Sequence, residues 1–257
     1  MRPLWTGAIG FGLVNIPVKL YSATEGSELD FDMLDKKDLS NIRFMRVNEK
    51  TGKEVKWENI VKGYMLQNKY VILEKKDFDK AGAEKTKSID ISDFVSLEEV
   101  DSVYYETPYY LVPDKSGIRA YALLREALKK TGKAGIASFV MRNKEALAIL
   151  RTSGEMIILN KIRFQEEIRD TKELNVPKTT IKPAEMKMAV SLINQLTGKF
   201  NITKYKDTYT EQLLKIIKAK SKGTKIAEPQ MKVVHNKTKD LMEQLKASLG
   251  SKNKKAS

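Results

Sequence analysis

The chain has 257 residues, 41% of them hydrophobic, with 47 Lys and Arg against 33 Asp and Glu and a formal net charge of +14. This size fits one large domain, or one domain with a small appendage. The basic excess predicts a polyanionic partner, either nucleic acid or an anionic membrane surface. Because there is no cysteine, disulfide scaffolds and thiolate-ligated zinc or iron–sulfur sites are excluded. No apolar run reaches about 18 residues, so no transmembrane helix is predicted.

The first two thirds of the chain predict a mixed β/α structure that is mainly β. The uncharged run at residues 3–18 contains three glycines and favours strand–turn–strand, with a secretion signal as the alternative. Thr51-Gly52 predicts a turn between strands at Phe44–Val47 and Val55–Trp57. Many short strands separated by turns are typical of a barrel or a sandwich. The other predicted strands are Val14–Ala23, Tyr70–Leu73, Ser88–Val95, Ser102–Glu106, Pro108–Val112, Gly135–Met141, Ala146–Thr152 and Glu155–Ile162.

Helices are predicted once within this β region and throughout the last third. Gly117–Thr131 places Ile118, Tyr121, Leu124 and Leu128 on one stripe, and Gly132 can end that helix. After a polar stretch at 166–177, Pro183 can begin a second helix at its first turn. The predicted C-terminal helices are Ala184–Leu196, Thr208–Lys222 and Asn236–Leu249.

Motifs for enzyme chemistry are weak. Gly10-Phe11-Gly12 resembles the start of a dinucleotide loop, but Asn15 stands where a third glycine is needed. The only histidine, His235, lies in the lysine-rich tail, so a histidine-based triad or zinc site is not expected. The acidic clusters at 98–101 and 166–170 leave open a metal-dependent nuclease, although neither has the spacing of a metal-ligand set. We expect no catalytic residue, cofactor or metal site.

Basic residues gather in the first third of the chain. Around Thr51-Gly52 they predict a basic hairpin or arm that lies along phosphates. The alternative is the ordinary polar outer face of a strand pair. The candidate DNA-binding residues are Lys36, Lys37, Arg43, Arg46, Lys53, Lys56 and Lys62.

The C-terminal region carries most of the excess charge. From Lys199 onward there are 15 lysines and five acids, which gives +10 of the total +14. Lysine is a point charge that holds phosphates without reading bases, although a solvated tail is the simpler alternative. The last predicted helix also has leucines at four-residue spacing, which can dock on the core or on a partner. The candidate tail contacts, to DNA or a partner, are Lys218, Lys220, Lys222, Lys225, Leu241, Leu245 and Leu249.

Longer blocks of sequence resemble those of the prokaryotic Ku family, in family order from about Trp5 to Lys222. The first block includes FGLVNIPVKLYSAT, and a later one is PYYLVPDK. Blocks of this length are far more specific than the short motifs above. They are Trp5–Gly7, Phe11–Thr24, Trp57–Tyr64, Pro108–Lys115, Ala120–Leu128, Met188–Phe200 and Tyr205–Lys220.

The resemblance implies a Ku-type β-barrel core over residues 1–200, with an inserted DNA-encircling arm at about 30–95 and a helical, lysine-rich region over 201–257. It implies a homodimeric ring that threads ends of double-stranded DNA, and recruitment of a multi-domain ATP-dependent DNA ligase in non-homologous end joining. It also implies a cytoplasmic, nucleoid-associated protein with no membrane partner. Many relatives carry cysteines in the arm, but this chain has none, so no metal role is transferred. A β-barrel adaptor that binds only proteins is the alternative.

Overall fold

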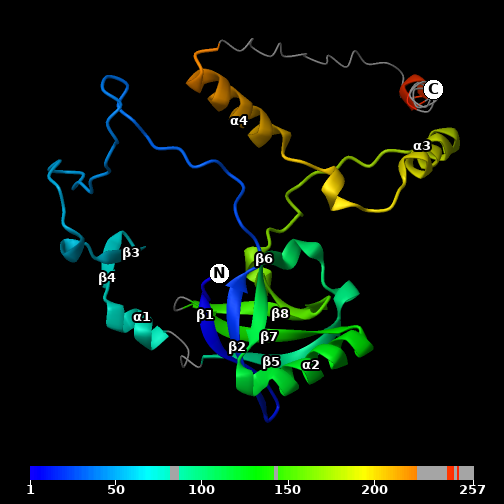
Figure 1. Cartoon of the computed structure of the whole chain (residues 1–257), viewed down its shortest axis with the longest axis horizontal. Coiled ribbons are helices and arrows are strands. Elements are labelled where there is room, and N and C mark those ends of the chain that lie inside the picture. Colours follow the sequence, from blue (N-terminus) through cyan, green and yellow to red (C-terminus); the bar gives the residue numbers. More distant parts are fainter. Residues whose placement is uncertain (82–86, 142–143, 225–241, 246–247, 249–257) are drawn as a thin grey trace. The chain divides into compact units, whose positions relative to one another are not determined.

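The computed structural model describes residues 1–81, 87–141, 144–224, 242–245 and 248 (Figure 1). The chain divides into two compact units. The first contains residues 1–26 and 30–170, and the second contains residues 27–29 and 171–257. Within the described residues, no helix is both long enough and apolar enough to cross a membrane.

The first unit is built on a closed barrel of seven strands in the order β1-β2-β6-β9-β8-β7-β5. All neighbouring pairs are antiparallel except β1 and β5, which are parallel and complete the closure. The strands are β1 (Trp5–Phe11), β2 (Val14–Ser22), β5 (Ser88–Ser96), β6 (Tyr105–Pro113), β7 (Lys133–Met141), β8 (Lys144–Ser153) and β9 (Met156–Ile162).

The closure point requires glycine at position 7. The Ala8 N–H donates to the carbonyl oxygen of Lys87 at 2.9 Å, just before β5 begins. A Cβ at Gly7 would collide with that same carbonyl and with the Trp5 ring. The two strands can therefore approach closely only because residue 7 has no side chain.

Alternating apolar residues of all seven strands point into the barrel and form one core. Ile9, Ile16, Ile89, Leu111 and Leu159 are fully buried there. Period-two alternation sends these side chains inward because successive residues of a strand face opposite sides. The interior of a barrel of this size is filled by side chains.

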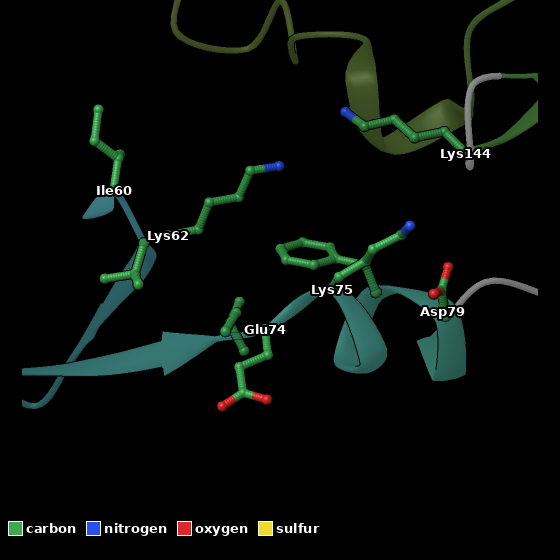
Figure 2. Close-up of a pocket in the computed structure, with 9 residues that line it drawn as sticks. Ile60, Lys62, Glu74, Lys75, Asp79 and Lys144 are labelled. Carbon is green, nitrogen blue, oxygen red and sulfur yellow. The ribbon is translucent and has the colours of Figure 1, made fainter. Parts of the chain in front are cut away.

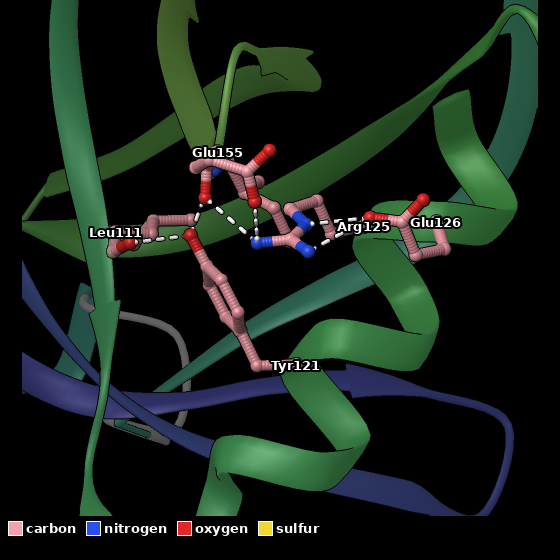
Figure 3. Close-up of polar contacts among 6 residues, drawn as sticks. Leu111, Tyr121, Arg125, Glu126 and Glu155 are labelled. Atoms are coloured by element: carbon pink, nitrogen blue, oxygen red, sulfur yellow. Dashed lines mark hydrogen bonds and ion pairs between the residues drawn. The ribbon is translucent and has the colours of Figure 1, made fainter.

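Helix α2 (Ile118–Thr131) packs its buried face against this core through Tyr121, Leu124 and Leu128. The Tyr121 hydroxyl donates to the Leu111 carbonyl oxygen and accepts from the Ile157 N–H, each at 2.7 Å (Figure 3). Burial raises the pKa of Tyr121 above its ordinary value, so the hydroxyl keeps the proton that it donates. A single side chain therefore ties the helix to β6 and β9.

Arg125 lies one helical turn further on and adds partly exposed ion pairs to the same contact. Its guanidinium pairs with the Glu155 carboxylate at 2.7 Å and with Glu126 at 2.8 Å (Figure 3). The hydrogen bond to Glu126 is the main cause that raises the Arg125 pKa. Exposed ion pairs contribute little, so burial of the leucines and Tyr121 is what holds the helix.

Between β2 and β5 the chain leaves the barrel as a long arm (Figure 1). The arm contains the hairpin of β3 (Lys62–Leu66) and β4 (Lys69–Leu73), followed by α1 (Lys75–Ala81). Gln67 and Asn68 connect the two strands with φ values of 46° and 63°, as a two-residue type I′ turn requires. No residue from Thr24 to Ala81 is buried.

The second unit carries two long helices. Helix α3 (Pro183–Leu196) begins with proline in its first turn, and the Lys182 N–H donates to the Glu185 carboxylate at 3.1 Å. Helix α4 (Thr208–Ser221) begins at Asp207, whose carboxylate accepts the Thr210 N–H at 3.0 Å. The hydrogen bonds from Thr210 lower the pKa of Asp207.

Most predicted elements are confirmed, including the strand–turn–strand at the N-terminus, the strands Ser88–Val95, Gly135–Met141, Ala146–Thr152 and Glu155–Ile162, and the helix before Gly132. The predicted strands Phe44–Val47 and Val55–Trp57 are wrong, because this segment pairs only through the isolated bridge between Val47 and Glu54. Ile118 is 57% exposed rather than part of the buried stripe. The predicted strands Ser102–Glu106 and Pro108–Val112 are a short 3-10 turn followed by the single strand β6. Most of the predicted helix Asn236–Leu249 lies outside the described residues.

We expect Tyr121→Phe to lower the free energy of unfolding by about 1–3 kcal/mol, because it leaves a buried N–H and a buried carbonyl without their partner. Denaturant unfolding measures the change. Tyr205→Phe is the matched control, since Tyr205 is 73% exposed. Equal unfolding free energies for the two variants would contradict the role given to Tyr121.

Candidate nucleic-acid interface

The first basic turn of the arm carries Lys36 and Lys37. The bridge between Leu34 and Asn41 closes this turn, and the Lys37 N–H donates to the Asp35 carboxylate at 2.8 Å. Both lysine side chains are exposed. Hydrogen bonds from Ser40 lower the pKa of the neighbouring Asp38, so an anionic carboxylate lies beside the two cations.

The second basic turn holds Arg46, Lys53 and Lys56 together. The Val55 N–H donates to the Arg46 carbonyl and the Asn48 N–H donates to the Lys53 carbonyl, both at 2.8 Å. Gly52 has φ of 64°, a conformation that glycine adopts without strain. Lys56 comes directly before the short 3-10 turn η1 (Trp57–Asn59).

Two predicted phosphate contacts are stacked on aromatic rings. The Arg46 guanidinium carbon lies 4.7 Å from the centre of the Trp57 ring, and the Lys62 ammonium lies 4.7 Å from that of Phe78. Such contacts stabilise by about 0.5–1 kcal/mol at exposed sites. They position each cation while leaving it accessible, because Arg46 and Lys62 are exposed.

Lys62 also lines a pocket of about 500 Å³ at the base of the β3–β4 hairpin (Figure 2). Ile60 lies on one side, while Glu74, Lys75 and Asp79 bring charges of both signs to the same pocket. The mixed charge makes this pocket less suited to a polyanion than the two basic turns.

The seven arm candidates share a feature that favours phosphate binding. None of them forms an ion pair with another described residue. Other lysines of this unit are paired, for example Lys76 with Glu74 at 2.7 Å and Lys19 with Asp114 at 2.7 Å. The hydrogen bond from Lys19 to Asp114 raises the Lys19 pKa. The arm cations are therefore free to neutralise an external anion.

The tail candidates are only partly described. Lys218 and Lys220 are exposed in the last turn of α4, and Lys222 caps the helix. Their charges complement the negative end of the helix dipole. Leu245 is half-buried in the short helical segment at 242–245. Lys225, Leu241 and Leu249 lie outside the described residues.

The acidic clusters serve local structure. The Asp101 carboxylate accepts the Val103 N–H at 2.9 Å, and the Glu167 carboxylate accepts the Phe164 N–H at 2.8 Å. Among the described residues, no three acidic or histidine side chains converge as a metal site would require. His235 lies outside them.

Sequence reasoning did not identify Trp57 and Phe78 as part of this surface. Each ring stacks with a cation many residues earlier in the chain, so no short motif connects them. The available signal was the interleaving of aromatic and basic residues through the arm, which is common in nucleic-acid-binding surfaces.

Residues 10–188 match the family model of the Ku70/Ku80 beta-barrel domain. Three similar proteins are each named "Non-homologous end joining protein Ku". The one from Coxiella burnetii is 42% identical, and the alignment covers 98% of this chain and 96% of that protein. The Archaeoglobus fulgidus protein is 40% identical over 97% of this chain and 98% of its own length. The Bacillus subtilis protein is 38% identical over 97% and 82%. With the seven-stranded barrel and its inserted arm, these matches establish that the chain belongs to the Ku family.

Proposed function

We propose that this protein is a homodimeric ring that binds the ends of linear double-stranded DNA without sequence specificity in non-homologous end joining. The observation that carries the proposal is the arm. Between Thr24 and Ala81 it exposes both unpaired cations and large apolar side chains, and it buries none of its residues. This combination fits a segment that packs against a second copy and faces a polyanion.

The apolar side chains support the dimer. Phe44 is 81% exposed, Trp57 72% and Tyr70 69%. A two-stranded hairpin such as β3–β4 is marginally stable alone in water, and many large exposed apolar side chains on one segment favour an interaction site. A second copy provides an identical arm, and a two-fold interface is self-complementary.

The cations support DNA binding that does not depend on base sequence. Lysines and arginines on exposed turns contact phosphates, which carry no sequence information. A closed ring that surrounds the duplex can be loaded only at a free terminus. End specificity then follows from topology, and no chemistry at the terminus is needed.

Membership of the Ku family identifies a DNA-binding repair protein rather than an enzyme. We further propose that the protein acts at the nucleoid in the cytoplasm, and that its C-terminal region recruits and stimulates a multi-domain ATP-dependent DNA ligase. The lysines of α4 and of the sequence after it support this role, because a charged C-terminal segment can bind an acidic partner surface.

A competition between linear and relaxed circular DNA of the same sequence tests the ring. Linear competitor should displace a labelled linear duplex, while circular competitor should leave the complex intact at the same concentration. Electrophoretic mobility shift measures the bound fraction. Equal competition by the two DNAs would refute threading.

The same assay on Phe44→Glu tests whether the dimer makes the ring. This variant should sediment at 29.2 kDa rather than twice that mass, and it should lose the preference for linear DNA. Leu13→Glu is the control, because Leu13 is fully exposed at the turn between β1 and β2. A wild-type protein that is monomeric yet binds DNA with full affinity would overturn the ring.

Arg43→Gln and Lys53→Gln test the phosphate contacts. Each substitution removes two contacts from a dimer, so the slope of log affinity against log salt should become about 1.8 less negative. Lys76→Gln is the control, since Lys76 is already paired with Glu74. Unchanged affinity after reversing the charge of Arg43 and Arg46 would favour the protein-binding adaptor instead.

Deleting the residues after Lys222 tests ligase recruitment. The truncated protein should remain a dimer and still prefer linear DNA, but stimulate ligation less than the full chain. The yield of duplex fragments that the ligase joins end to end provides the measurement. Loss of the dimer on truncation would instead assign the tail to assembly.

A further inference from the structure

An apolar groove lies on the barrel unit, between α2 and the strands β1 and β5. Its volume is about 540 Å³, within the range of about 300–1,000 Å³ that is usual for ligand pockets. Phe11, Phe94, Leu123, Ala127 and Leu128 line it. Leu123 is 69% exposed and Phe94 is 46% exposed, so water covers a surface that is almost wholly hydrocarbon.

The walls and floor of the groove are already in place without a bound partner. The rings of Phe11 and Phe94 meet edge to face, with centroids 6.4 Å apart and planes at 89°. Leu124 and Leu128 form its floor and are each only 3% exposed, because they belong to the barrel core. Rigid aromatic walls on a fixed floor bind with little loss of conformational entropy.

A smaller pocket of about 180 Å³ adjoins the groove and shares Leu128 and Lys133 with it. Lys129 and Arg151 also line this second pocket. No acidic residue lines either one, and neither Lys129 nor Lys133 is paired with another described residue. A hydrophobic site and an unneutralised basic site therefore lie side by side.

We propose that this two-part site docks a short segment of a partner protein in which apolar side chains stand next to Asp or Glu. The apolar residues occupy the groove, and the carboxylates reach Lys129, Lys133 and Arg151. Complementary charge distinguishes this occupant from the chain's own C-terminal region, which carries +10 from Lys199 onward and is repelled by the basic pocket. A DNA phosphate suits the basic pocket but leaves the apolar groove unfilled.

Peptide display on the full-length protein tests the site, with random short peptides as the probe. Enriched peptides should combine Leu, Phe or Met with Asp or Glu. Leu123→Glu should weaken a selected peptide about tenfold or more, as expected for a central apolar contact, and the double variant Lys129→Glu, Lys133→Glu should do the same. Fluorescence polarisation gives the affinities.

Ile118→Glu is the matched control. Ile118 is an exposed apolar residue of the same helix that does not line the groove, so this variant should bind the peptide as the wild type does. Enrichment of basic peptides, no enrichment, or full binding by Leu123→Glu would overturn the proposal.

Two further measurements separate the other occupants. Sedimentation of Leu123→Glu should give the wild-type mass, and a smaller mass would assign the groove to a second copy and refute the proposal. Linear duplex should not displace the selected peptide. Displacement together with loss of DNA affinity in the double lysine variant would assign the surface to DNA, which also refutes the proposal.

Discussion

The structure depends on one constraint, which is that the arm carries large apolar side chains that its own fold cannot bury. In its described part, from Thr24 to Ala81, the arm forms two isolated bridges, the 3-10 turn η1, one hairpin and one short helix, and none of its residues is buried. Burying apolar surface is worth roughly 25 cal/mol per Å², so leaving residues such as Phe44 and Trp57 in water is costly. In the proposed function a second copy of the arm buries this surface, so assembly and DNA binding belong to the same segment.

The barrel can carry such an arm because the strand pairing and the core of the barrel do not include arm residues. Every barrel strand pairs on both sides, so it offers no free edge on which the arm could add a strand. Tyr121 and the two leucines of α2 complete a core that draws on all seven strands. The arm can therefore leave after β2 and return before β5 without disturbing the frame that positions it.

The barrel strands could be predicted from the sequence because apolar and polar residues alternate along them. Alternating apolar residues bounded by turn glycines predict the buried strands, and leucines on one helical stripe predict α2. Ile118 fits the stripe by spacing but is 57% exposed at the first position of α2, and spacing alone does not reveal that the first turn leaves this side chain in solvent. The strand prediction for Phe44–Val47 was wrong because propensity counts β-branched and aromatic residues without showing whether a neighbouring strand pairs with them.

The candidate site was predictable in composition but not in geometry. The basic residues of the arm could be counted in the sequence. Whether each one is available to bind phosphate depends on whether it lacks an acidic neighbour in the fold. Lys76 and Lys19 look no different from Lys53 in the sequence, but the fold pairs the first two with carboxylates and leaves the third unpaired. The Arg46 guanidinium likewise lies over the Trp57 ring, a neighbour that spacing in the sequence does not reveal. Net charge predicts attraction to a polyanion, whereas the proposed contact residues depend on which cations the fold leaves unpaired.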